Sequence, residues 1–216
     1  AMPAGLLRFL VPEPERLSER AVQLAYLCGL DPIPAACRAK LVDGELHVER
    51  DSSESVKLNL PWSVDGLGQP LLTTATLLQR DRPYLLPLEL ARGKLNQLRN
   101  QFAEWVAQGL VPTGEVNDRI AEAVRLFGRA AVDQSDARRC AAMSQEALAA
   151  SCAAADAATN SYVEQVLAVR HRSVAQLPIA CGLTFGKKIL DPATTTAAGM
   201  LCNTGCVSMT WRDVVR

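Results

Sequence analysis

The sequence predicts an α+β protein in which a strand-rich segment, a helical segment and an incomplete βαβ unit follow one another along the chain. Short apolar runs separated by turn residues fill residues 1–85, and apolar residues recur at helical spacing through 86–173. Two apolar runs flank a short helical stretch in 174–216. We therefore expect an antiparallel β-sandwich-like domain, a helical connector and a partial βαβ unit with these boundaries.

The composition is typical of a soluble globular protein. Of the 216 residues, 49% are hydrophobic and 21% are charged, and no uninterrupted apolar segment approaches the roughly 18 residues of a membrane helix. The 23 basic residues balance the 23 acidic residues. We therefore expect neither a membrane span nor a nucleic acid partner held by positive charge.

The clearest strand signal is a hairpin over residues 36–50. Asp43-Gly44 separates two runs of alternating polarity, and this dipeptide favours a two-residue type I′ turn. If Val42 pairs with Glu45, apolar residues gather on one face of the hairpin and polar residues on the other. The apolar face then holds Ala39, Leu41, Leu46 and Val48, and the polar face holds Lys40, His47 and Glu49.

Further strands are expected at residues 6–11, 55–60 and 71–78, where β-branched and apolar residues alternate with polar ones. One short helix is expected at 15–27, because its apolar residues share a helical face. Together these elements predict a small antiparallel sandwich.

Three amphipathic helices are expected between residues 86 and 173, arranged as a helical hairpin or a three-helix layer. The first begins at Pro87 and ends before Gly109, the second follows Pro112, and the third runs from about Ser135 toward His171. The stripe of the second helix contains Val116, Ile120, Val124, Phe127 and Ala131. The third helix has a seam of mostly small residues, which permits close helix packing: Ala137, Ala141, Ser144, Leu148, Ser151, Ala155, Ala158 and Tyr162.

The C-terminal segment predicts a parallel βαβ unit. Apolar runs at 177–185 and 206–211 flank a short helix within 192–202. Parallel strands need helices packed on both faces and neighbouring strands at their edges, so two such strands alone form an incomplete sheet. We expect the chain to stop where a larger domain begins.

This C-terminal pattern resembles the first two barrel strands of the xylanase-like glycoside hydrolases of family ten. The resemblance rests on residues 177–186 and on the segment that contains Asn203, Met209, Thr210 and Trp211. Residues 82–93 are similar to the helical lead-in of relatives in that family. The resemblance implies that the βαβ unit is the start of a (β/α)8 barrel.

For function, the resemblance implies the N-terminal accessory and connector region of an endo-xylanase-like protein that acts on plant-type polysaccharide. Asn203 and Trp211 are the implied carbohydrate contacts, whereas Thr210 stands where the family has its sugar-binding lysine. The two catalytic glutamates of the family would lie beyond Arg216, so we expect no catalytic residue in this chain. From its own position at the border of the sandwich, Trp62 is a candidate stacking surface for a sugar.

A non-enzymatic helical protein-interaction module is the alternative function. The seven cysteines form no CxxC pair and have no histidine near Cys181, Cys202 or Cys206, so we expect reduced thiols, no metal and no cofactor. The partners consistent with this interpretation are a polysaccharide or oligosaccharide, a second copy of the chain, or a missing C-terminal part. A cytoplasmic location is the default expectation, and a mature secreted chain would have a similar N-terminus.

Overall fold

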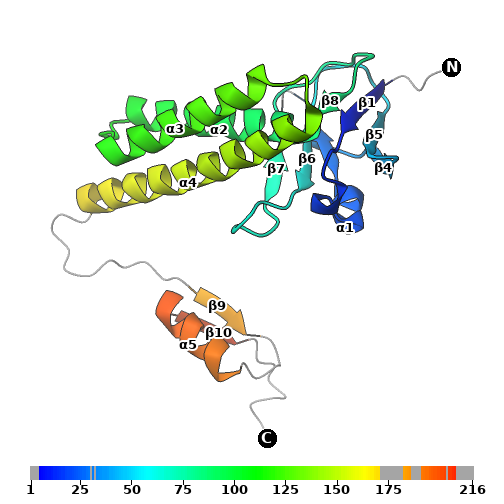
Figure 1. The fold of residues 1–216 in the computed structure, drawn as a ribbon. Coiled ribbons are helices and arrows are strands. Elements are labelled where there is room, and N and C mark those ends of the chain that lie inside the picture. The colour runs from blue at the N-terminus through cyan, green and yellow to red at the C-terminus, as the bar shows by residue number, and fades with distance from the viewer. Residues whose placement is uncertain are drawn as a thin grey trace, which may run out of the picture. The chain divides into compact units, whose positions relative to one another are not determined.

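The computed structural model describes residues 5–29, 31, 33–170, 182–185, 191–202 and 204–207 (Figure 1). Within these residues the protein is a mixture of helices and strands, which confirms the predicted α+β class. The chain separates into two compact units, Ala1–Val166 and Leu167–Arg216.

The first sheet of the N-terminal unit contains four strands in the order β4-β5-β1-β8. Their bounds are Gly5–Leu10 for β1, Arg38–Val42 for β4, Glu45–Arg50 for β5 and Tyr84–Leu85 for β8. The strand β1 pairs antiparallel with β5 but parallel with β8, where Phe9 lies opposite Tyr84. The prediction of a purely antiparallel sheet is therefore wrong at β8, because the chain reaches this strand through a long crossover that forms the second sheet.

The hairpin β4–β5 has the predicted turn and register. Asp43 and Gly44 both have positive φ, 50° and 80°, as a type I′ turn requires. Val42 pairs with Glu45 and Leu41 with Leu46. Leu46 and Val48 are fully buried on the core side of the sheet.

The second sheet is antiparallel throughout and has the order β3-β2-β6-β7. Its strands are β2 (Tyr26–Cys28), β3 (Pro34–Ala35), β6 (Lys57–Pro61) and β7 (Leu71–Thr73). The helix expected at 15–27 is shorter, since the chain forms a 3-10 turn at Pro14–Arg16 and α1 at Glu19–Gln23. The helix ends early because residues 26–28 pair with β6 instead.

Three long helices follow, as predicted: α2 (Leu86–Ala107), α3 (Gly114–Val132) and α4 (Ala137–Arg170). Gly109, with φ 105°, ends α2 in the left-handed conformation. Figure 1 shows α4 running beside α2 and α3, and side chains of all three helices form one buried cluster. The expected stripe of α3 is corrected at one position, since Ala123 is fully buried whereas Val124 is 39% exposed.

The seam of α4 buries small residues as its sequence predicts. Ser144 and Ser151 are fully buried, and each hydroxyl donates a hydrogen bond to the carbonyl four residues earlier, at 2.7 Å. These internal hydrogen bonds let two polar groups enter a helix interface without unpaired donors.

One core joins the strands and the helices. Its largest cluster includes Phe9 of β1, Leu58 of β6, Leu90 of α2 and Leu148 of α4, all with 0% exposure. The segments expected as separate regions, 1–85 and 86–173, therefore share buried side chains.

The C-terminal unit contains the expected parallel βαβ arrangement. Its described elements are β9 (Gly182–Phe185), α5 (Pro192–Leu201) and β10 (Thr204–Val207), and β10 pairs parallel with β9. The Asp191 side chain begins α5 by accepting a hydrogen bond from the Thr194 N–H at 2.9 Å. The other residues of the expected strands 177–185 and 206–211 lie outside the described residues.

Candidate functional site

The residues predicted to contact carbohydrate do not form a site in the described part of the chain. Asn203 and Trp211 lie outside the described residues. Trp62 has 0% exposure and belongs to the main core cluster. An apolar ring buried on both faces offers no surface for a sugar, so the expected stacking surface at Trp62 is corrected to a core position.

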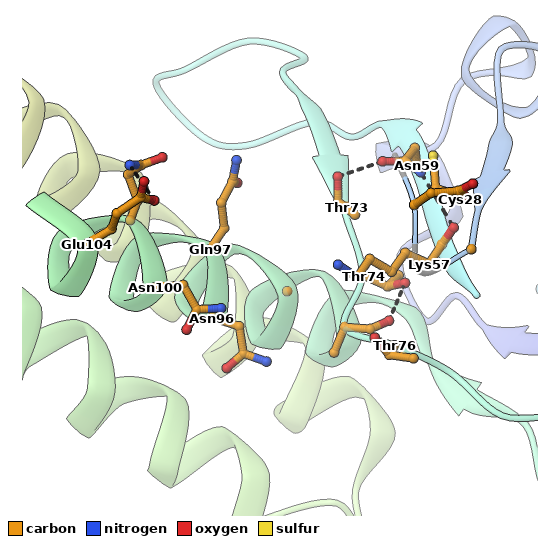
Figure 2. Close-up of a pocket in the computed structure, with 15 residues that line it drawn as sticks. Cys28, Lys57, Asn59, Thr73, Thr74, Thr76, Asn96, Gln97, Asn100 and Glu104 are labelled. Carbon is orange, nitrogen blue, oxygen red and sulfur yellow. Dashed lines mark hydrogen bonds between the residues drawn. The ribbon is translucent and has the colours of Figure 1, made fainter. Parts of the chain in front are cut away.

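A polar cavity of about 540 Å³ lies instead between the second sheet and α2 (Figure 2). Strand residues such as Asn59 and Thr73 line one side of it, and successive turns of α2 line the other. Side-chain amides and hydroxyls dominate the lining: Asn59, Asn96, Gln97, Asn100 and Gln101, with Thr73, Thr74 and Thr76.

A close approach between α2 and the end of β7 forms the base of this cavity. A Cβ atom placed on Gly93 would lie 1.9 Å from the Thr73 carbonyl oxygen, so only glycine fits there. The Ala75 N–H also donates to the Glu89 carbonyl oxygen at 3.3 Å. These contacts fix the helix on the strand, and the following turns of α2 then present their amides to the cavity.

The strand side of the cavity is held by hydrogen bonds. The Thr73 hydroxyl donates to the Asn59 Oδ1 atom at 2.6 Å, and the Leu58 N–H donates to the Thr74 hydroxyl at 3.0 Å. Asn59 is only 5% exposed and Thr74 only 1%. This wall is therefore preorganised, whereas the amides on α2 are exposed and can turn toward a ligand.

The cavity is suited to binding a neutral polar ligand. Each side-chain amide can donate and accept hydrogen bonds, and so can each hydroxyl. Charged lining residues are few, namely Lys57, Asp31 and Glu104, and Glu104 accepts hydrogen bonds from Gln101 and Gln108 at 3.5 and 3.3 Å. Among the described residues that line it there is no histidine and no aromatic ring.

The sequence contains a signal for this cavity that hydropathy patterns do not reveal. The amide pairs Asn96-Gln97 and Asn100-Gln101 are four residues apart, which places them on one face of a helix. Their partner Asn59 is 37 residues away from Asn96 in the sequence, so only the fold brings the two sides together.

A buried carboxylate lies on α2 one turn before Gly93. Glu89 is 4% exposed, its Oε1 atom is 3.4 Å from the Arg92 guanidinium, and its Oε2 atom is buried without a hydrogen-bond partner. Burial raises the pKa of this carboxyl, and the nearby arginines Arg92 and Arg80 oppose that rise.

We expect the free energy of unfolding of the protein to fall, relative to Glu89→Gln, as the pH rises above the ordinary carboxyl pKa. The folded state binds the proton more tightly than the unfolded state, so this contribution decreases with pH by up to about 1.4 kcal/mol per unit until the folded pKa is passed. Urea unfolding of both proteins between pH 4.5 and 8 measures the difference. Parallel curves for the two proteins would contradict the prediction.

The polar face of the β4–β5 hairpin forms a solvated ion-pair network. Arg8 donates to both carboxylate oxygens of Glu45, the shortest at 2.8 Å, and a His47 ring nitrogen is 3.1 Å from the same carboxylate. The Arg8 guanidinium lowers the pKa of Glu45. All three side chains are partly exposed on the face away from the core, so we assign them no chemical role.

The described cysteines and acidic residues do not form a reactive thiol site or a metal site. Burial raises the pKa of the Cys140 and Cys152 thiols, which disfavours the reactive thiolate. The Cys140 thiol donates to the Ala130 carbonyl at 3.1 Å and so has a packing role. No group of three histidine, cysteine or acidic residues within the described ranges is placed to hold a metal ion.

Comparisons with models of known protein families, with curated proteins and with solved structures gave no match. In the described part of the chain, none of the helices has both the length and the hydropathy of a membrane-crossing segment.

Proposed function

We propose that this chain is the N-terminal accessory and connector region of a glycoside-hydrolase-like protein that acts on plant-type polysaccharide. In this proposal the chain contributes carbohydrate binding and contains no catalytic residues. The observation that carries the proposal is the cavity of about 540 Å³ between the second sheet and α2, with its lining of amides and threonine hydroxyls.

The chemistry of the lining favours a polyhydroxylated ligand over the other common classes. Sugar hydroxyls both donate and accept hydrogen bonds, and so do the groups that line the cavity. An anionic ligand would meet Asp31 and Glu104 with Lys57 as the only cation among the described lining residues. An apolar ligand would leave many amide groups without partners, which is costly.

The C-terminal unit supports the larger assignment. A parallel strand pair with an intervening helix is the repeating unit of a (β/α)8 barrel. The same segment carries the resemblance to the family-ten hydrolases. Residues 174–216 would then be the start of the catalytic barrel, preceded by the binding region.

Calorimetric titration of the protein with xylohexaose tests the proposal. We expect binding by the wild-type protein, and a loss of roughly tenfold or more in affinity for the double variant Asn96→Ala, Asn100→Ala, because two hydrogen-bonding groups are removed. Both residues are exposed on a helix, where alanine favours folding.

The variant Gln23→Ala is the matched control. It removes an exposed amide from the short helix α1, and we expect it to bind as the wild-type protein does. No binding of xylohexaose by the wild-type protein would contradict the proposal. Concentration-dependent self-association without carbohydrate binding would favour the alternative, a helical protein-interaction module.

A further inference from the structure

A second, smaller cavity lies on the adjoining face of α2. Its volume is about 240 Å³, and it is located between α2 and α4. Leu98 and Trp105 line it from α2, and Ala155 and Thr159 line it from α4. It therefore differs from the first cavity in having an apolar and aromatic part.

The aromatic wall of this cavity is fixed in place. Trp105 is stacked on Tyr162 with ring centroids 4.5 Å apart and an angle of 13° between the ring planes. Trp105 also packs against the buried cluster formed by the three long helices. The indole is only partly exposed, so it is held at the cavity wall by its own contacts before any ligand arrives.

The two cavities share residues. Gln97 and Gln101, two exposed amides one helical turn apart, line both of them. Figure 2 shows Gln97 extending from α2 between the strand end that carries Thr73 and the turn that carries Glu104. A ligand that extends from the first cavity across these amides therefore reaches the cavity that Trp105 lines.

We infer that the two cavities form one extended site for a linear oligosaccharide, with Trp105 as the contact for its far end. This inference rests on the proposed carbohydrate-binding function and specifies its ligand as a chain longer than a disaccharide. The first cavity hydrogen-bonds the hydroxyls of the first sugar rings, Gln97 and Gln101 support the chain where it crosses α2, and Trp105 packs against the apolar face of a later ring.

Titration with xylo-oligosaccharides from the disaccharide to the hexasaccharide tests the inference. For the wild-type protein we expect the affinity to rise by about tenfold or more from the shortest to the longest ligand. For Trp105→Ala we expect the hexasaccharide to bind no more tightly than the disaccharide, while the affinity for the disaccharide stays within about twofold of wild type.

A second variant tests the inference while Trp105 and its packing contacts are kept. Thr159 is exposed on α4, so Thr159→Arg fills the small cavity from the surface and covers the indole without removing a buried group. We expect that the affinity of this variant also does not increase with ligand length. Trp105→Tyr, which keeps an aromatic wall, is expected to restore most of that increase.

The outcomes separate the inference from the proposed function. A gain with length that persists in both Trp105→Ala and Thr159→Arg would overturn the inference and leave the first cavity as the whole site. Equal affinity of the wild-type protein for all lengths would do the same. No binding of any length would contradict the proposed function itself, and the inference with it.

Discussion

The substitution Gly93→Ala is expected to destabilise the protein by about 3 kcal/mol or more. The added Cβ would lie 1.9 Å from the Thr73 carbonyl oxygen and 2.5 Å from the Thr74 carbonyl carbon. Both atoms belong to the backbone, so no side-chain rotation relieves the contact. The helix α2 must move away from β7, and the backbone hydrogen bond from Ala75 to Glu89 must lengthen or break.

Gly128→Ala is the matched control for this substitution. Gly128 also lies inside a helix, α3, but a Cβ placed there has no neighbouring atom within 4 Å. We expect this variant to gain about 0.5–1 kcal/mol, because alanine has the higher helix propensity. Urea unfolding followed by circular dichroism measures both changes. Equal stabilities of the two variants would show that α2 does not approach β7 this closely.

The substitution Trp62→Ala is expected to cost about 3–5 kcal/mol, a large part of the stability of a typical domain. Trp62 is among the largest side chains with 0% exposure, and it packs in the cluster that includes both sheets, α2 and α4. Its removal leaves a cavity in that core cluster. Thermal and urea unfolding measure the loss.

Trp62→Phe separates packing from hydrogen bonding at the same position. The indole Nε1 atom is buried without a hydrogen-bond partner, so phenylalanine loses some volume but also removes an unsatisfied donor. We expect a loss below about 1.5 kcal/mol. A loss as large as that of Trp62→Ala would contradict the description of Trp62 as a packing residue whose N–H makes no contribution.

Local signals predicted much of the fold. The Asp43-Gly44 turn specified the hairpin register residue by residue, and Pro87 and Gly109 marked the two ends of α2. In each case the deciding interactions lie within a few residues of one another. The parallel relation of β9 and β10 also followed from a local pattern, two apolar runs around a helix.

Elements that depend on distant partners were missed. Residues 26 and 27 lie in the helix expected at 15–27, but pairing with β6 makes 26–28 a strand. In the stripe of α3, Val116, Ile120 and Phe127 pack in the helix cluster as predicted, but Ala123 takes the place expected for Val124. Small residues give a weak hydropathy signal even when they mark the closest contact.

The candidate site could not be predicted for the same reason. A tryptophan near a sheet is equally compatible with a surface and a core position, and only the packing shows that Trp62 lies in the core. The cavity depends on the close contact at Gly93, which lets α2 pack against β7. This contact places the amides of the helix opposite Asn59. Nothing local to either segment indicates that contact.

The parallel pairing of β1 with β8 has a consequence for the order in which the protein folds during its synthesis. The hairpin β4–β5 and strand β1 can associate once residue 50 has emerged from the ribosome, but β1 keeps one open edge until residues 84–85 arrive. At about 5–20 residues per second, this delay lasts a few seconds. During that interval the nascent chain exposes unpaired backbone groups beside Phe9 and Leu10. Closing this edge of β1 therefore waits until the strands of the second sheet have all been synthesised.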